Sequence, residues 1–527
     1  MYYKIKDILD STLQKDVILE IPKDSKIGHL ATPIAFILAK ELKKNPSNIA
    51  KDLIKKLQHY NEFENIREVN GFINFTLSKN FLADISSKLL ENPNSFIKEV
   101  GSKSILLEFV SANPTGPLHI GHARGAIFGD TLARIGRKLG YKITTEYYIN
   151  DAGSQIDMLG LSIYLTTKEL LGQEVQYPES YYRGEYINNI AKKAKDIFDK
   201  NLFLNPLDSA FCKELGAFGV NEILFLIKEN LKNANIEFDN FVSEKVLSKD
   251  MSSTLEKLEQ NNALYNEDSK VWLKSSLKGD EKDRVVIREN GEPTYLAGDI
   301  IYHNDKFKRG FDSYINIWGA DHHGYIARIN ASIDFLGYDS SKLEVLLSQM
   351  VSLLKAGKPF KMSKRAGNFI LMQDVIDEIG IDAMRFIFIT KKADTHLEFD
   401  LDFLKSEDSN NPLYYINYAN ARIHTILNKS SVKNGFEFEK IDSAIWIDLL
   451  IYALLLPKFL ESSFSEKSLQ KLPEYLKNLA SKLHFCYNSS KIIGNSFEGE
   501  ILSILKIVSL SITTGLSCMG IVAKIKM

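Results

Sequence analysis

The sequence is poor in cysteine and has almost no net charge over its 527 residues. Its three cysteines, Cys212, Cys486 and Cys518, are far apart and have no CxxC spacing, which argues against a disulfide framework and a cysteine-rich zinc site. Because 66 Lys and Arg residues stand against 67 Asp and Glu residues, the formal charge is −1, and this excludes a histone-like polycation. A local basic patch can still bind nucleic acid within a neutral total.

Long uncharged hydrophobic runs are also missing. The first residues include Asp7 where a signal peptide requires an apolar stretch, so we expect no secretion signal. The segment 507–523 comes nearest to a membrane span, but Ser, Thr and Gly interrupt it, and we expect a buried terminal helix. With 44% hydrophobic and 25% charged residues, the composition is that of a globular protein, and the few cysteines fit a reducing cytoplasm.

Three regions follow from the hydrophobic pattern, in line with a length of roughly 150 residues per domain. Residues 1–98 predict a small α+β domain. Residues 99–375 predict an α/β domain with an insertion around 157–285, where the pattern is hard to interpret. Residues 376–527 have helical spacing of apolar residues almost throughout, and they predict an all-α domain.

The middle region opens with the order strand, turn and helix. An apolar run at 104–110 predicts a buried strand, the turn-rich stretch 111–117 follows, and 120–139 has helical spacing. A second strand is expected at 142–149. This order is typical of an α/β nucleotide-binding unit. Further strands are expected at 284–287, 293–296 and 313–318.

The expected helix at 120–139 begins with the letters HIGH, residues 119–122. His119 and His122 are three residues apart and therefore lie on one face of the helix. Gly121 leaves room for a flat ligand such as a purine, and a helix N-terminus suits phosphate. Imidazole donors could stabilise the charge that develops on an α-phosphate under attack. A bare HxGH can equally be a helix start with two satisfied histidines, and we interpret the partial repeat Ile27-Gly28-His29 as structural.

A second motif, KMSKR, occupies residues 361–365. From Lys355 to Arg365 there are five cations and no acid, and Gly357 and Gly367 flank the loop that carries the motif. Lysines on such a loop can close over a polyphosphate and neutralise a pyrophosphate leaving group. A solvated basic loop is the usual alternative. The position of this motif, about 240 residues after HIGH, favours the nucleotide-binding interpretation.

HIGH after a strand, followed by KMSK and a helical region, resembles the class I aminoacyl-tRNA synthetases. Further segments resemble the arginyl-tRNA synthetase family in particular: 108–114, 150–155, 295–300, 318–324, 381–385 and 411–419. Residues 1–98 are similar to the extra N-terminal domain of that family. The resemblance covers nearly the whole chain and is weakest at 157–285. It implies a Rossmann-like parallel-sheet catalytic domain, a small α+β N-terminal domain and an all-α C-terminal anticodon-binding domain.

The resemblance implies that ATP, with Mg²⁺, activates L-arginine to arginyl-adenylate with release of pyrophosphate, and that arginine then passes to the 3′ end of an arginine-accepting tRNA. His119, His122, Lys361 and Lys364 would be the catalytic residues. The family motif has Ser where this chain has Arg365, which should matter little because the lysines carry the charge. The ATP-binding set would add Gly121, Gly319, Asp321, His322, Met362 and Ser363.

Selection of arginine requires acids, because a guanidinium is planar, permanently charged and best bound by carboxylates. By the resemblance, Asp299 and Glu244 would meet the guanidinium and Tyr295 would pack beside it. The remaining pocket residues would be Ser111, Asn113 and Gln155 at the α-amino and carboxylate end, with Glu108 on the strand. The context of Glu244 matches the family only loosely.

Tyr414, Asn417 and Tyr418 lie at helical spacing in the C-terminal region, and stacked aromatic rings commonly bind unpaired RNA bases. We expect this surface to face the tRNA, although the tyrosines could instead pack in a helical core. We expect no resident metal, since His322 and His323 have no third ligand at suitable spacing. We also expect no membrane, a cytoplasmic location and a monomer. The alternatives are another class I synthetase, a cofactor-making nucleotidylyltransferase and a non-catalytic tRNA-binding paralogue.

Overall fold

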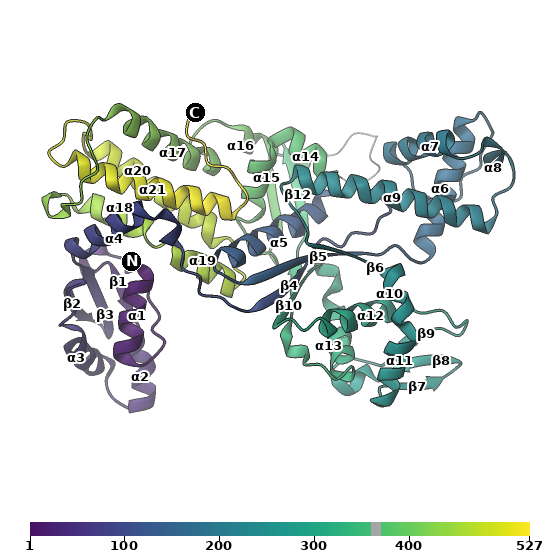
Figure 1. The fold of residues 1–527 in the computed structure, drawn as a ribbon, viewed down its shortest axis with the longest axis horizontal. Helices are drawn as coiled ribbons and strands as arrows, with labels where there is room; N and C mark the ends of the chain where they lie inside the picture. Colours follow the sequence, from purple (N-terminus) through teal and green to yellow (C-terminus); the bar gives the residue numbers. More distant parts are fainter. Residues whose placement is uncertain (360–369) are drawn as a thin grey trace. The chain divides into compact units, whose positions relative to one another are not determined.

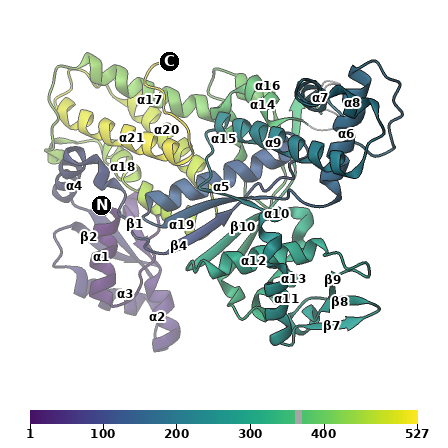
Figure 2. The same cartoon turned by 45° about the vertical axis from the view of Figure 1, so that its right-hand side comes forward.

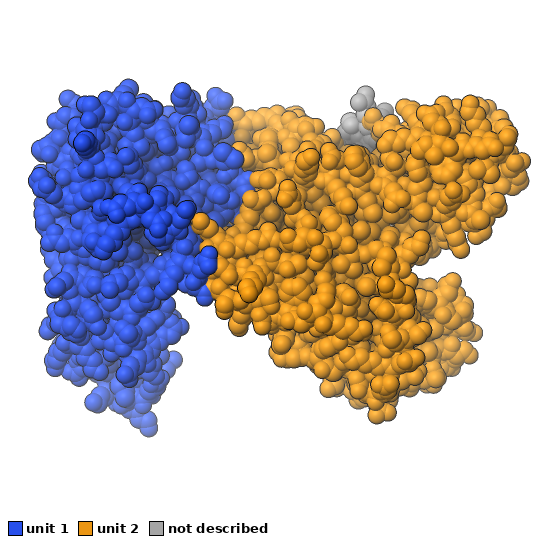
Figure 3. All heavy atoms as spheres, in the orientation of Figure 1, with its two compact units in different colours: residues 1–100, 406–527 blue, residues 101–405 orange. Residues whose placement is uncertain are grey.

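The chain divides into two units in the computed structural model, which describes residues 1–359 and 370–527 (Figure 3). One unit combines residues 1–100 with 406–527, and the other is continuous from 101 to 405. The predicted motif residues Lys361, Met362, Ser363 and Lys364 lie outside the described residues.

The unit formed by residues 101–405 is built on a five-stranded sheet in which all neighbouring strands are parallel. In spatial order the strands are β11 (Leu343–Ser348), β10 (Ser313–Gly319), β4 (Ser104–Glu108), β5 (Lys142–Ile149) and β6 (Asn240–Ser243). Apolar runs such as Ile105 to Leu107 form central strands because both faces of the sheet are covered. The carboxyl ends of the parallel strands therefore meet at one edge, where loops can carry polar side chains.

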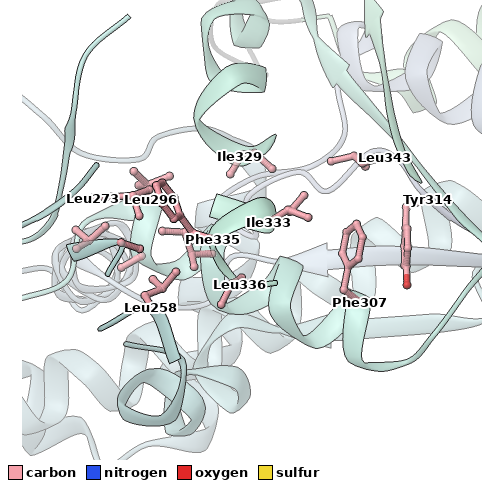
Figure 4. Close-up of a cluster of buried hydrophobic side chains, with 14 of the residues drawn as sticks. Leu258, Leu273, Leu296, Phe307, Tyr314, Ile329, Ile333, Phe335, Leu336 and Leu343 are labelled. Atoms are coloured by element: carbon pink, nitrogen blue, oxygen red, sulfur yellow. The ribbon is translucent and has the colours of Figure 1, made fainter. Parts of the chain in front are cut away.

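Helices cover the two faces of this sheet. Helix α5 (Ile120–Lys138) lies on one face, whereas α12 (Tyr295–Lys308) and α13 (Ile326–Phe335) lie on the other, as Figure 1 and Figure 2 show. The second face forms an apolar core to which the sheet contributes Leu106 and Tyr314 (Figure 4). The ring of Phe307 stacks on Tyr314 with 4.1 Å between centroids, which joins α12 to strand β10.

Between β5 and β6 the chain forms a helical excursion. It comprises α6 (Ser154–Leu170), α7 (Glu185–Ile197), α8 (Lys200–Leu204) and α9 (Ser209–Asn233). Gly160 on α6 and Gly216 on α9 let these two helices approach closely. A Cβ on Gly160, for example, would lie 2.1 Å from the Cys212 carbonyl oxygen. The chain then returns to the sheet as β6, so the interval 157–285 contains a sheet strand as well as these helices.

After β6 come two short helices, α10 (Glu244–Leu247) and α11 (Met251–Gln260), and an antiparallel sheet. Its strands are β7 (Leu264–Glu267), β8 (Lys270–Leu273) and β9 (Arg284–Ile287). The prediction of a strand at 293–296 is wrong, because Pro293 forms only an isolated bridge and Tyr295 begins α12. The buried positions Leu296, Ala297 and Ile300 have helical spacing, which outweighs the short apolar run.

A small sheet of β12 (Val351–Lys355), β13 (Lys358–Pro359) and β14 (Leu397–Asp400) completes this unit, with helices α14 (Met372–Ile379), α15 (Ile381–Phe388) and α16 (Leu401–Lys405). The expectation of an almost wholly helical chain after 377 therefore misses β14. That strand buries Leu397 and Phe399 and exposes Glu398, an alternation too short to outweigh the surrounding helical pattern.

The unit formed by residues 1–100 and 406–527 has an antiparallel sheet and a bundle of helices. The sheet consists of β1 (Leu30–Thr32), β3 (Phe72–Leu77) and β2 (Phe63–Val69). Its first part also contains α1 (Tyr2–Leu13), α2 (Ile34–Leu42), α3 (Pro46–Leu57) and α4 (Lys79–Glu91). The bundle consists of α17 (Pro412–Lys429), α18 (Ala444–Ala453), α19 (Leu456–Ser465), α20 (Lys471–Ser489) and α21 (Glu498–Cys518). His29 has the structural role expected of it, because its Nδ1 accepts a hydrogen bond from the Leu77 amide at 2.9 Å.

Helix α21 has the length and apolar composition of a membrane span, and it is the single such helix among the described residues. It nevertheless lies mostly buried, with α17, α18 and α20 packed around it. This packing confirms the expected buried helix near the end of the chain.

Replacement of a core leucine should destabilise the unit of residues 101–405. Leu336 is 1% exposed in the core of Figure 4, so Leu336→Ala should lower the free energy of unfolding by about 2–5 kcal/mol through lost burial and a cavity. Leu277, which is 72% exposed, provides the matched control, and Leu277→Ala should change stability by less than about 0.5 kcal/mol. Urea unfolding followed by circular dichroism measures both, and equal midpoints would contradict the assignment of this core.

Candidate active site

A pocket of about 360 Å³ opens at the carboxyl edge of the parallel sheet. Its walls come from the ends of β4, β5 and β10 and from the first turns of α6, α10 and α12. All seven residues that the sequence predicted for arginine binding line this pocket: Glu108, Ser111, Asn113, Gln155, Glu244, Tyr295 and Asp299. Gly319 and His322 of the predicted ATP set line it as well. Residues from distant parts of the chain therefore form a single site.

Two of the pocket acids, Asp299 and Glu244, have tyrosine hydroxyls as partners. Burial, together with the charges of Glu108 and Glu244, raises the pKa of Asp299 to about 7, although a hydrogen bond from Tyr325 and the charge of Lys306 act to lower it. Burial also raises the pKa of Glu244, against a hydrogen bond from Tyr148. A tyrosine hydroxyl stabilises a carboxylate without neutralising it. The pocket is therefore suited to a cationic ligand that can pair with both acids.

Glycine at the start of α12 determines where Glu244 can lie. A Cβ on Gly298 would be only 2.8 Å from Glu244 Oε1, so the Glu244 side chain lies across the first turn of α12. Asp299 is the next residue of that turn. The absence of a side chain at position 298 thus lets two acids from different helices approach the same ligand position.

The turn after β4 presents the polar end of the pocket. Val110 and Ser111 both have left-handed backbone conformations, with φ of 69° and 42°, which cost free energy in residues other than glycine. Ser111 Oγ donates to Glu108 Oε1 at 2.8 Å and accepts from the Tyr148 amide at 3.1 Å. Asn113 Nδ2 donates to Gln155 Oε1 at 2.9 Å. These bonds hold the turn in its strained shape and place amide and hydroxyl groups at the pocket wall.

The HIGH motif forms the N-terminus of α5, as the sequence predicted. His119 is the N-cap, its Nδ1 accepts from the Gly121 amide at 3.2 Å, and its ring stacks on His122 with 3.7 Å between centroids. Burial lowers the pKa of His119, and burial together with His119 lowers the pKa of His122 to about 3. Both imidazoles are therefore neutral near pH 7 and act as hydrogen-bonding groups at the positive end of the helix dipole.

The chain that follows the KMSKR motif is bonded to the HIGH segment. The Ile120 amide donates to the Ile370 carbonyl at 2.8 Å, and the Met372 amide donates to the Leu118 carbonyl at 2.9 Å. Because Ile370 comes five residues after Arg365, these bonds connect the residues just after the KMSKR motif to the start of the HIGH helix α5.

Gly319, Asp321 and His322 lie where β10 ends and a short 3₁₀ helix begins. A Cβ on Gly319 would be 2.4 Å from Asp321 Oδ1, so a side chain at position 319 would displace this exposed carboxylate. Asp321 and His322 are exposed, with 3.7 Å between Oδ2 and Nε2. Over the described parts of the chain, no group of three or more His, Cys, Asp or Glu side chains is arranged to hold a metal ion.

The predicted tRNA-binding residues belong to the other unit, on helix α17. Tyr414 and Tyr418 stack with 6.3 Å between centroids and 5° between ring planes, and Tyr418 is 42% exposed. Asn417 is buried, and its Oδ1 accepts from the Lys524 amide at 3.0 Å. The tyrosines are thus available at a surface, whereas Asn417 lies beneath it and holds the C-terminal segment.

Two tyrosines that contact the acids were missed by the sequence reasoning. Tyr148 is the seventh residue of β5 and hydrogen-bonds Glu244, and Tyr325 hydrogen-bonds Asp299. A signal was present for Tyr325, which directly follows the family-like segment 318–324. For Tyr148 the signal was its place at the carboxyl end of an expected strand, next to the segment 150–155.

A parallel sheet with a HIGH-bearing helix at its first strand–helix turn defines the catalytic fold of class I aminoacyl-tRNA synthetases. The matching family profiles are "tRNA synthetases class I (R), catalytic domain" over residues 84–400, "Arginyl tRNA synthetase N terminal domain" over 3–77 and "DALR anticodon binding domain" over 416–527. The chain belongs to the arginyl-tRNA synthetase family, which confirms the resemblance inferred from the sequence.

Relatives match over the full length. The chain is 54% identical to the arginine–tRNA ligase of Nitratiruptor sp. and 56% identical to that of Wolinella succinogenes, each with complete coverage of both chains. A solved arginyl-tRNA synthetase structure from Campylobacter jejuni has a TM-score of 0.82 and 52% identity, and the match covers 86% of this chain and 100% of that one.

The raised pKa of Asp299 predicts a pH-dependent cost to stability. The folded pKa of about 7 exceeds the ordinary value of 3.8, so the cost grows as pH rises from about 4 to 7 and stays constant above. Asp299→Asn should therefore raise the melting temperature more at pH 8 than at pH 5, by about 1–3 °C given the partial exposure of this wall. Asp196→Asn on the surface serves as control. An equal gain at both pH values would contradict the shift.

Proposed function

We propose that the chain is an arginine–tRNA ligase. It activates L-arginine with ATP to form arginyl-adenylate and pyrophosphate, and then transfers arginine to the 3′ end of its tRNA. One observation carries this proposal: Asp299 and Glu244 line the same pocket, and this pocket lies at the sheet edge where the HIGH helix begins. The family assignment decides against a cofactor-making nucleotidylyltransferase.

Arginine recognition follows from the chemistry of the pocket. The guanidinium would pair with Asp299 and Glu244, which have hydroxyl partners in Tyr325 and Tyr148. Tyr295 would pack beside the guanidinium. A neutral or shorter side chain would leave two half-buried acids without a cation, and such unpaired polar groups give strong discrimination. Ser111, Asn113 and Gln155, together with Glu108, would bind the α-amino and carboxylate end of the substrate.

ATP activation involves groups at the N-terminus of α5. The arginine carboxylate attacks the α-phosphate, a bond to that phosphorus forms, and the bond to the pyrophosphate oxygen breaks. His119 and His122, neutral by their lowered pKa values, would donate hydrogen bonds to the oxygen on which charge develops. Gly121, Gly319, Asp321 and His322 would contact the adenosine part. Lys361, Met362, Ser363 and Lys364 would hold the phosphates.

Mg²⁺ would accompany ATP rather than reside in the protein. The described residues include no cluster of three or more ligating side chains, and Mg²⁺ commonly keeps its waters and is held by substrate phosphates. Bound in that way, the ion would neutralise charge on the pyrophosphate. The donor set therefore fits an ion delivered by the substrate.

The remaining parts of the chain would bind tRNA. We assign residues 1–98 to tRNA contact, 99–375 to catalysis and 376–527 to anticodon binding. The stack of half-buried Tyr414 and exposed Tyr418 supports the last assignment, since flat rings can receive unpaired bases. Asn417 would support that surface from below. A monomer in the cytoplasm belongs to the same proposal.

The direct test is aminoacylation of total tRNA by the purified protein, with ATP, Mg²⁺ and each amino acid in turn. The tRNA is included because activation of arginine could depend on it. Charging with arginine alone is the expected result. Charging with a different amino acid would keep the fold and overturn the pocket assignment, and no charging with matched tRNA would favour a non-catalytic paralogue.

Removal of a motif histidine should slow activation selectively. His122→Ala deletes a donor to the transition state, so kcat for arginyl-adenylate formation should fall by about 10²–10³-fold with a small change in the KM for arginine. His396, an exposed histidine of the same unit, gives the matched control His396→Ala, which should be near normal. Rates within threefold of each other for the two variants would contradict the role of His122.

A further inference from the structure

Behind the pocket lies a fully buried ammonium group that the proposed mechanism does not use. Lys306, on α12, is 0% exposed. Its Nζ is ion-paired with Glu108 Oε2, donates to Asn316 Oδ1 at 2.8 Å and lies 4.3 Å from the ring centroid of Tyr302. Lys306 does not line the pocket, whereas Glu108 does. The acid thus stands between a buried cation and the substrate position.

Both oxygens of Glu108 are committed on the protein side. Oε2 accepts from Lys306, and Oε1 accepts from Ser111 Oγ at 2.8 Å. Ser111 is the second residue of the strained turn and also accepts from the Tyr148 amide. The position of Glu108 therefore determines the shape of the turn that presents Ser111 and Asn113.

The lysine is itself fixed from the opposite side. Asn316 turns its Oδ1 to Lys306, which directs its Nδ2 to His303 Nε2 at 3.1 Å. Since His303 Nε2 accepts there, its Nδ1 carries the proton and donates to the Asp299 carbonyl at 2.8 Å. Burial lowers the pKa of His303 to about 3, in agreement with this neutral form. Because a lysine ammonium group can only donate, Lys306 fixes which group donates and which accepts in the hydrogen bonds that run from Asn316 through His303 to the Asp299 carbonyl.

We propose that Lys306 is a positioning residue for arginine use, which acts through Glu108 to hold Ser111 and the strained turn at the α-amino and carboxylate end of the pocket. The inference rests on the proposed arginine–tRNA ligase function. A buried ion pair alone is weak support for stability, because apolar replacements are often equally stable. The role of this pair is instead one of orientation: it keeps Glu108 in a single arrangement at the pocket wall.

The neighbouring strand provides an internal comparison. Glu146 on β5 is also fully buried and pairs with Arg309, the residue that caps the C-terminus of α12, with bonds of 2.5 and 2.8 Å. Glu146 does not line the pocket. Loss of the Glu146–Arg309 pair should lower stability without changing the polar end of the pocket. Comparison of the two pairs therefore distinguishes a structural role from a positioning role.

The test measures kcat and the KM values for arginine and ATP in tRNA aminoacylation by the full-length protein. Lys306→Met should raise the KM for arginine at least tenfold and leave the KM for ATP within threefold. Arg309→Met is the structural control and Lys308→Met the exposed control on the same helix, and both should keep the KM for arginine within threefold.

A double variant tests the route of action and protects against loss of folding. Lys306→Met with Glu108→Gln removes both buried charges together, which proteins often tolerate. Its KM for arginine should equal that of Glu108→Gln alone within threefold, because the lysine has no further effect once the carboxylate is gone. A tenfold difference in the KM for arginine between the double variant and Glu108→Gln would overturn the proposal. A normal KM for arginine in Lys306→Met, or equal increases in the KM values for arginine and ATP, would overturn it as well. Failure of the wild-type protein to charge arginine would instead overturn the proposed function.

Discussion

A carboxylate cannot be buried at the edge of an apolar sheet without partners, and the catalytic unit depends on how each acid meets this requirement. Glu146 pairs with Arg309, Glu108 pairs with Lys306, and Asp130 on α5 pairs with the buried Arg385. Asp299 and Glu244 differ, since their side-chain partners are tyrosine hydroxyls. The acids paired with cations stabilise the fold of this unit. Asp299 and Glu244, whose partners are neutral donors, can still bind a cation.

In the proposed site, one strand of the parallel sheet connects the arginine position to the ATP position. Strand β4 ends at Glu108, and its continuation forms the turn with Ser111 and then the HIGH segment at the start of α5. One strand therefore leads directly from the amino-acid side to the phosphate side. Ile370, which follows the second motif along the chain, is bonded to the same place. A displacement of this turn would move Ser111 and Asn113 at the proposed arginine position, whereas the start of α5 is held separately by its backbone bonds to Ile370 and Met372.

The sequence was sufficient for elements with a strong periodic pattern. Strand β5 occupies residues 142–149 as expected, and α5 begins at the expected residue. The strand expected at 293–296 failed because a run of only four residues does not distinguish a strand from the first turn of a buried helix. Periodicity also cannot reveal partners distant along the chain. The roles of Lys306 and Asn316 therefore became visible only in three dimensions, whereas Asp299 and Glu244 came from the family resemblance.

Burial shifts the ionisable groups of the proposed site in one direction, toward neutrality. It lowers the pKa values of His119 and His122 and raises those of Asp299 and Glu244. A guanidinium beside Asp299 favours its charged form and must lower a pKa of about 7. In the proposed site, arginine binding near neutral pH would therefore be linked to release of part of a proton. A shorter cation such as lysine would reach fewer acceptor oxygens and would stabilise the charged form of Asp299 less. The burial that disfavours ionisation of this acid therefore also increases the preference for arginine over lysine.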